Sequence, residues 1–422
     1  MTRVLRRRKQ LSVPYDANNT FTIEMEYAYY AYLLYSILGR ALGLSASFLG
    51  VGILTLLAGL CVRRLKGQAF TFYAPIAPAM WCAFSFVTIQ VGLHGESIMG
   101  DSVRLFVTWI PTLILLYSIS LRKGFLHRFA LVVFGIGLSA LPYLQYESSG
   151  SVERAALNRE VSGVLAGANG LAAWFGFCAL FFILKAIETI RLLDRALSSL
   201  AAIVCLFVVA FTVSRGVLVS VAISLVLAFQ RSLRRAFLPV LFLTILLAIA
   251  LTTGLLDSII TSYSERGAEE TGRLLVWPVA IERFLASPIF GVGLANVGSD
   301  IGSGRLISPH NSFLFIGIAS GVIPLGFFVA YWSRAFSGAF RSYAKRAPYG
   351  LFCMPLTCYA FMVSFASNVP FMVPWAVATL SVAIGSGVRR LNQAHHHQNK
   401  INRTATNEKV RNRILPHMLP KR

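Results

Sequence analysis

The 422-residue sequence contains little charge. Charged residues make up 13% of the chain, against 56% hydrophobic residues, and the mean hydropathy is +0.66. A soluble domain uses about 25% charged residues. The apolar residues also occur in long runs bounded by short polar clusters, as in membrane-spanning helices. This composition excludes an ordinary soluble enzyme and predicts an all-α polytopic membrane protein.

Several motifs that carry common chemistry are absent. There is no GxxxxGK[ST] sequence and no DxD sequence, so neither a P-loop nor a metal-dependent nucleotide-sugar site is predicted. The six cysteines include no CxxC pair, and we expect neither a zinc site nor a disulfide framework. Acidic residues are almost absent from the apolar runs, which argues against a proton-coupled transporter. We therefore predict no metal and no cofactor.

The net charge of +22 arises from 39 Lys and Arg against 17 Asp and Glu. The basic residues do not form one patch, so nucleic acid is not an expected partner. They lie in short clusters between apolar runs, mainly in one set of alternate connections and at both ends of the chain. By the positive-inside rule, those connections and both termini are cytoplasmic.

A bilayer core of about 30 Å requires roughly 20 helical residues, and this length predicts about twelve transmembrane helices. The predicted spans are 27–42, 44–62, 72–93, 103–121, 128–146, 169–187, 196–213, 216–230, 236–254, 311–331, 350–367 and 370–388. The run 197–229 is too long for one crossing, so we divide it at Ser214-Arg215-Gly216. The run 27–62 is divided in the same way at 39–43.

These spans divide the chain into five parts. From N- to C-terminus they are a basic cytoplasmic arm (1–26), transmembrane helices 1–9 (27–254), a periplasmic loop (255–310), transmembrane helices 10–12 (311–388) and a disordered basic cytoplasmic tail (389–422). We expect no cleaved signal peptide, because no small-residue cleavage site follows the first apolar run.

The periplasmic loop is the largest polar segment between predicted spans, and loops of this length are usually functional or disordered. Leu274, Trp277, Ile281 and Leu285 are spaced three and four residues apart in it. This spacing predicts an amphipathic helix that lies on the membrane surface or covers a cavity. Pro278 predicts that the helix breaks or begins near that residue.

Arginine on the non-cytoplasmic side requires an explanation, because the positive-inside rule disfavours it. The candidates are Arg154, Arg159, Arg215, Arg266, Arg273, Arg283 and Arg305. Arg215 is the most informative, because it lies in a tight external turn at the membrane boundary. Its guanidinium either extends to lipid headgroups, forms a structural ion pair, or binds an anion such as phosphate bidentately.

The spans predicted to begin at Asn169, Ser214 and Asn311 start on the non-cytoplasmic side, each with a residue that favours helix caps. Helix N-termini attract anions, although the sequence does not determine whether these three lie together. His310 precedes the third of them, after Pro309. A helix N-terminus disfavours imidazolium, so His310 is either a neutral base that accepts a hydroxyl proton or an interfacial histidine without chemistry.

The segment from about 159 to 332 resembles the bacterial O-antigen ligase and O-antigen polymerase superfamily. The pieces that carry the resemblance, in the family's order, are Arg159 with Asn169-Gly170-Leu171-Ala172, then Thr212-Val213-Ser214-Arg215-Gly216, Gly272-Arg273 with Trp277, Pro288-Ile289-Phe290-Gly291-Val292-Gly293, and Pro309-His310-Asn311-Ser312-Phe313-Leu314 with Gly321.

The resemblance implies a glycosyltransferase at the periplasmic face of the bacterial inner membrane. Its donor would be glycan linked to undecaprenyl pyrophosphate, and its acceptor lipid A-core or a growing polysaccharide, with membrane lipids around it. Arg215 would bind the pyrophosphate and His310 would activate the acceptor hydroxyl, with inversion at the anomeric carbon. The other residues expected to contact substrate are Arg273, Arg266, Arg159, Asn311 and Asn169.

Two alternatives stay open at this point. A polysaccharide repeat-unit polymerase would use the same chemistry with a different acceptor, and nothing in the sequence separates it from a ligase. A flippase or other transporter of lipid-linked glycan would require charged residues deep in the spans, along a path, and the sequence has almost none.

Overall fold

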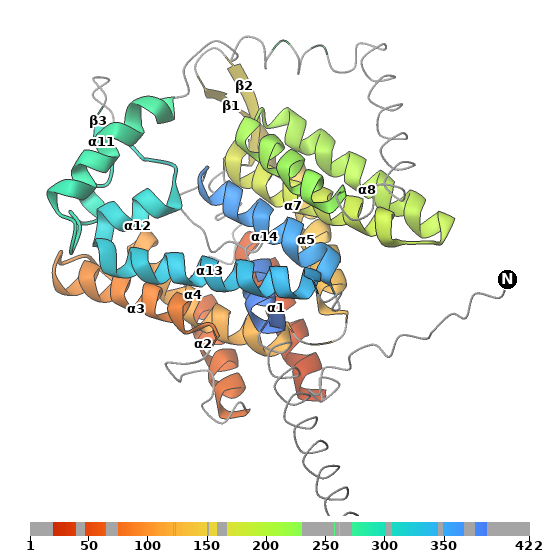
Figure 1. Cartoon of the computed structure of the whole chain (residues 1–422), viewed down its shortest axis with the longest axis horizontal. Helices are drawn as coiled ribbons and strands as arrows, with labels where there is room; N and C mark the ends of the chain where they lie inside the picture. Colours follow the sequence, from red (N-terminus) through yellow and green to blue (C-terminus); the bar gives the residue numbers. More distant parts are fainter. Residues whose placement is uncertain are drawn as a thin grey trace, which may run out of the picture.

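The computed structural model describes residues 20–38, 47–64, 75–98, 100–120, 122, 124–149, 152–157, 167–229, 257, 261, 272–300, 306–344, 349–366 and 376–385. This part of the chain is mostly helical, in agreement with the predicted class (Figure 1). The predicted span 236–254 and the predicted tail lie outside it.

The elements of the first half are α1 (Thr20–Leu38), α2 (Ser47–Arg64), α3 (Ala77–Gly92), α4 (Asp101–Ile119), α5 (Phe125–Ala140), the 3-10 turn η2 (Leu141–Tyr143), β1 (Leu144–Ser149), β2 (Val152–Leu157), α7 (Ala168–Glu188) and α8 (Leu192–Phe211). Those of the second half are helix Arg215–Phe229, α11 (Gly272–Ala286), η4 (Leu294–Asn296), β3 (Ser299–Asp300), β4 (Leu306–Ile307), α12 (Ser312–Ser320), α13 (Val322–Ala344), α14 (Gly350–Ser364) and helix Ala376–Gly385.

Three helices of the described ranges are long and apolar enough to cross a membrane. They are Phe125–Tyr143, Ala168–Glu188 and Leu192–Phe211. Shorter apolar helices in the same ranges are Ala77–Gly92, Val103–Ile119, Arg215–Phe229, Gly350–Ser364 and Ala376–Gly385. The apolar helices support a membrane protein, while the count of about twelve spans and the side of the termini stay predictions.

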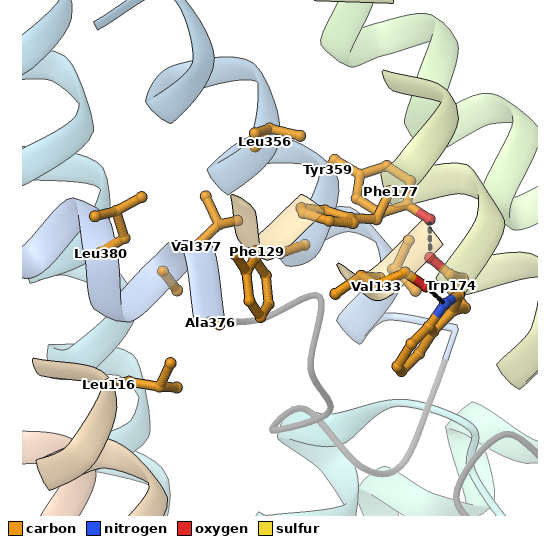
Figure 2. Close-up of a cluster of buried hydrophobic side chains, with 14 of the residues drawn as sticks. Leu116, Phe129, Val133, Trp174, Phe177, Leu356, Tyr359, Ala376, Val377 and Leu380 are labelled. Carbon is orange, nitrogen blue, oxygen red and sulfur yellow. Dashed lines mark hydrogen bonds between the residues drawn. The ribbon is translucent and has the colours of Figure 1, made fainter. Parts of the chain in front are cut away.

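α7 lies at the centre of the bundle. Every residue from 171 to 184 is buried, as expected for a helix that is apolar on all sides. Figure 2 shows two hydrogen bonds that join it to its neighbours: Trp174 Nε1 donates to the carbonyl of Val133 in α5 at 2.8 Å, and Tyr359 Oη of α14 donates to the carbonyl of Ala173 at 2.7 Å. Buried polar atoms that find such partners fix how the helices pack.

The predicted division of the run 197–229 is confirmed. α8 ends at Phe211, and the next helix begins at Arg215. The division of 27–62 is confirmed in the same way, since α1 ends at Leu38 and α2 begins at Ser47.

The region after α5 corrects the prediction. The expected span 128–146 stops at Ala140, where Pro142 follows in a 3-10 turn, because proline cannot donate the next helical hydrogen bond. β1 and β2 then form an antiparallel hairpin in which Tyr146 pairs with Ala155. A second small sheet pairs β3 with β4. The all-α description therefore needs these two short hairpins added.

α11 confirms the predicted amphipathic helix but not its faces. The helix continues through Pro278, where we expected a break or a start. Val276 and Ala280 are buried, whereas Ile281 and Leu285 are exposed by 46% and 65%. α11 packs on α12, and the exposure of Ile281 and Leu285 shows that the apolar stripe read from the spacing is only partly a packing face.

The predicted span 311–331 is not one straight helix. α12 ends at Ser320, and α13 folds back along it from Val322. The rings of Phe313 and Phe328 lie 4.9 Å apart between centroids, although a straight helix would separate these residues by about 22 Å. α12 and α13 therefore form a helical hairpin around Gly321, and α13 is the long member.

Gly321 makes this hairpin possible. Its φ of 81° lies in the left-handed region, and a Cβ at this position would overlap the backbone of Ile289. Gly291, with a φ of 72°, meets the backbone of Ala319 in the same close approach. Gly291 and Gly321 therefore let the segment after α11 pack backbone to backbone against the α12–α13 turn.

We expect Gly321→Ala to lower the free energy of unfolding by about 2–4 kcal/mol, because the new Cβ forces a strained turn apart. Gly326→Ala is the matched control: a Cβ at Gly326 in α13 meets nothing within 4 Å, so this variant should unfold at or slightly above the wild-type temperature. Thermal unfolding of the purified protein in detergent measures both. Equal stability of the two variants would contradict the close packing at Gly321.

Candidate functional site

The turn between α8 and helix Arg215–Phe229 is strained. Val213 has a φ of 50°, a conformation that a β-branched residue adopts at a cost in energy, and it is buried. Thr212 Oγ1 donates to the carbonyl of Val209 at 2.6 Å and stabilises the end of α8. Such outliers persist where the surrounding structure holds them, and they are frequent at functional sites.

Arg154 of β2 holds this turn from the side. Its guanidinium donates from Nε to the carbonyl of Thr212 at 3.0 Å and from Nη2 to Asn169 Oδ1 at 3.0 Å. The residue is only 8% exposed. The β1–β2 hairpin, which the sequence did not predict, therefore places an arginine against the turn that carries Arg215.

Asn169 has a different task from the one predicted. We expected it to cap a helix, but α7 begins at Ala168, and Gly167 occupies the cap position without a side-chain hydrogen bond. Asn169 Oδ1 instead accepts from Arg154 and from Ser214 Oγ, the latter at 3.3 Å. One amide thus joins the hairpin, α7 and the turn.

Arg215 is the first residue of its helix and is partly buried. Its Nη2 atom is buried and has no hydrogen-bond partner among the residues that the structure describes. Leaving a buried, charged donor unsatisfied is costly, so such an atom calls for an explanation. An anion at this point would supply the missing acceptor, and the start of the helix would favour its charge.

His310 lies at the start of α12. Its φ is 46°, in the left-handed region, and the residue before it, Pro309, is buried. Trp277 Nε1 of α11 donates to the carbonyl of Pro309 at 2.9 Å. Asn311 caps α12 as predicted, since its Oδ1 accepts from the N–H groups of Phe313 and Leu314.

α14 lies between the turn that precedes Arg215 and the start of α12 at His310. At the start of α12, the ring of Phe313 stacks on that of Phe365, just after α14, with 5.1 Å between centroids. It also contacts the ring of Phe361 edge-on at 5.7 Å. On the other side of α14, Tyr359 Oη donates to the carbonyl of Ala173 in α7. Ala173 lies four residues after Asn169. The turn before Arg215 and the start of α12 after His310 therefore lie near the same end of α14, its C-terminal end. We call this the Arg215 end of the bundle.

The sequence left open whether the three predicted helix starts lie together, and the structure joins two of them. Asn169 and Ser214 are hydrogen-bonded to each other, whereas α12 starts on the other side of α14. Arg273 lies in the first turn of α11, and its side chain is outside the described residues. Arg159 and Arg266 also lie outside them.

Sequence reasoning named Arg154 only as one external arginine among several. The structure adds its hydrogen bonds to the turn, and it adds Trp277 as a partner of the backbone before His310. No spacing rule links residues in a hairpin to a turn 58 positions later. The only signal was that an arginine on that side of the bundle required a reason.

Residues 200–329 match the family model described as O-antigen ligase. The matched segment contains the strained turn, Arg215, α11, the glycines at 291 and 293, His310, α12 and the first part of α13. No curated protein matches the chain. Residues 200–329 are therefore similar to the O-antigen ligase family, which supports the resemblance found in the sequence.

Proposed function

We propose that this protein is a membrane glycosyltransferase that moves a glycan from undecaprenyl pyrophosphate to an acceptor hydroxyl at the periplasmic face of the bacterial inner membrane. The family match supports the class of reaction. The observation that carries the site is the buried Nη2 of Arg215, which no described residue bonds. Arg215 directly follows a strained turn that Arg154 and Asn169 hold in place.

In this proposal, Arg215 binds the donor pyrophosphate. Guanidinium stays charged when partly buried and contacts phosphate oxygens bidentately. As the bond to the sugar breaks, negative charge grows on the departing pyrophosphate. The guanidinium of Arg215, already held in place, stabilises that charge without reorganisation. Asn169 contributes by holding Ser214 and Arg154, and Arg273, Arg266 and Arg159 are proposed as further contacts to the donor.

His310 is proposed as the general base. The acceptor oxygen bonds to the anomeric carbon, the bond from that carbon to the pyrophosphate oxygen breaks, and the acceptor proton passes to His310. A single displacement inverts the anomeric configuration. Because pyrophosphate is already a good leaving group, an arginine for the anion and a base for the hydroxyl are sufficient, without a metal or a nucleotide. Asn311 supports His310 by capping the helix that follows it.

The orientation follows from charge. At the end of the bundle opposite the Arg215 end, Glu26 of α1 accepts from Arg122 and from Arg128, whose Nε lies 2.7 Å from the carboxylate. Basic residues near this end also include Lys185 and Arg195. The positive-inside rule makes this end cytoplasmic and the Arg215 end periplasmic. A lipid-held donor would then reach the site from the outer leaflet.

Deleting the protein from its host tests the proposal. We expect donor glycan to accumulate on its lipid carrier, as seen by extracting membrane lipids and separating the carrier-linked glycans by size. Full-length glycan on the carrier indicates a ligase, whereas single repeat units on the final acceptor indicate a polymerase. A deletion strain with a normal carrier pool and a normal surface polysaccharide would contradict both.

A further inference from the structure

The C-terminal end of α12 accepts hydrogen bonds from the segment after α11 and from Gln90 of α3. A helix leaves its last carbonyl groups without partners inside the helix. Here the N–H groups of Val292 and Gly293 donate to the carbonyls of Ile318 and Ala319, at 2.7 and 3.1 Å. The segment that follows α11 therefore ends α12 and fixes how far α12 extends.

Gln90 of α3 joins both of these segments at once. Its side-chain amide is fully buried, and Nε2 donates to the carbonyl of Ala319 and to Ser320 Oγ, each at 2.7 Å. Its Oε1 accepts from the N–H of Leu294 at 3.0 Å. One glutamine thus bonds the end of α12 and the segment after α11, and no hydrophobic residue of the same size could replace these bonds.

A second contact comes from His94, just after the end of α3. His94 Nε2 lies 3.1 Å from the carbonyl of Phe290, and the ring of His94 packs where a Cβ of Gly293 would stand. At the other end of this assembly, Trp277 of α11 bonds the carbonyl of Pro309, next to His310. Gln90 and His94 therefore join the segment after α11 to the C-terminal end of α12, and His310 lies at the other end of α12.

We propose that Gln90 is a positioning residue for His310. This inference rests on the proposed function, in which His310 is the base. α12 has nine residues, so it is about 14 Å long and acts as a short rigid rod. If the end at Ala319 shifts, the end at His310 shifts with it. A displacement of about 1 Å at a reacting group costs up to about a hundredfold in rate.

A role in positioning differs measurably from a role in folding alone. Loss of positioning lowers the rate at saturating donor and leaves donor binding intact, because Arg215 lies on other elements. Loss of folding lowers the amount of active protein and leaves the rate per folded molecule unchanged. The reaction rate therefore has to be measured against both donor concentration and the folded fraction.

The test compares Gln90→Met with Thr357→Val. Methionine keeps the length of glutamine and removes its hydrogen bonds. Thr357 of α14 is equally buried, and its Oγ1 bonds Ser381 Oγ at 2.8 Å, away from α12. Purified protein is assayed with lipid-linked donor and acceptor extracted from the deletion strain. In parallel, the rate at which diethyl pyrocarbonate modifies His310 is followed by mass spectrometry.

For Gln90→Met we expect the rate at saturating donor to fall at least about tenfold, with the half-saturating donor concentration changed less than about twofold. The modification rate of His310 should change by about threefold or more. Thr357→Val should keep both values within about twofold per folded molecule. If Gln90→Met does not fold, Ser320→Ala removes one of the bonds, and a rate about threefold lower is expected.

A wild-type rate and a wild-type modification of His310 in the folded Gln90→Met or Ser320→Ala protein would overturn the inference. His310→Asn in the same assay separates the two levels of the argument. If His310→Asn is inactive while Gln90→Met is fully active, only the positioning role fails. If His310→Asn is fully active, the proposed base fails, and the inference fails with it.

Discussion

Arg215→Ala should lower the rate of glycan transfer by at least about a hundredfold, which is the effect of removing a donor that stabilises charge in a transition state. Within the described part of the chain, the buried Nη2 of Arg215 has no hydrogen bond to lose, so the substitution should leave the fold nearly unchanged. Removing an unsatisfied buried charge can even stabilise the folded protein. Surface polysaccharide in the complemented deletion strain and the rate with purified protein both measure the effect.

Arg215→Lys refines this prediction. Lysine keeps the positive charge but replaces a planar, forked donor with a point charge, so we expect it to restore less than about a tenth of the lost rate. Arg195→Ala serves as the control, because Arg195 lies at the other end of α8, where its guanidinium donates to the carbonyl of Thr189. Full activity of Arg215→Ala at normal protein levels would exclude Arg215 as the anion site.

His310→Asn should reduce the rate about a thousandfold, within the range for removing a general base. Asparagine is chosen because His310 has a positive φ, which asparagine tolerates better than other residues do. The variant should therefore keep the start of α12 and lose only the imidazole. Initial rates with purified protein, corrected for the folded fraction, provide the measurement.

His127→Asn is the matched control for His310→Asn. The His127 ring contacts Phe181, Tyr349 and Phe352 in the half of the bundle that carries Glu26, away from both candidate groups. We expect this variant to retain the wild-type rate per folded molecule. Equal losses of the rate per folded molecule in the two histidine variants would contradict a specific role of His310 in proton transfer.

The sequence predicted those features of the fold that depend on local chemistry. The length of a bilayer crossing required a break at Ser214-Arg215-Gly216, and α8 ends at Phe211 as that argument demands. The cap at Asn311 followed from its residue type and position, and its side chain makes the expected bonds. Each of these predictions used residues within a few positions of one another.

The features that the sequence did not predict depend on packing between distant segments. An unbroken apolar run at 311–331 is compatible with one straight helix, and only the contact of Gly321 with Ile289 shows why the chain folds back. The β1–β2 hairpin follows a proline that ends α5, but its pairing has no strong alternation to reveal it.

The candidate site shows the same limit. Residue type identified Arg215 and His310 as unusual, because each stands where its chemistry requires a reason. The bonds that hold them come from residues far away in the sequence: Arg154 for the turn, Trp277 for Pro309 and Gln90 for α12. A glutamine inside the apolar run of α3 was a visible signal, but its partners lie 204 to 230 positions away.

The most direct test of the central claim is to follow the lipid carrier itself. Purified protein in vesicles is given lipid-linked glycan and acceptor from the deletion strain, and the carrier products are identified by mass spectrometry. The proposed reaction predicts free undecaprenyl pyrophosphate in amounts equal to the glycan joined to the acceptor, and none with His310→Asn. Donor that crosses the bilayer intact, with no carrier released, would contradict glycosyl transfer and indicate a transporter.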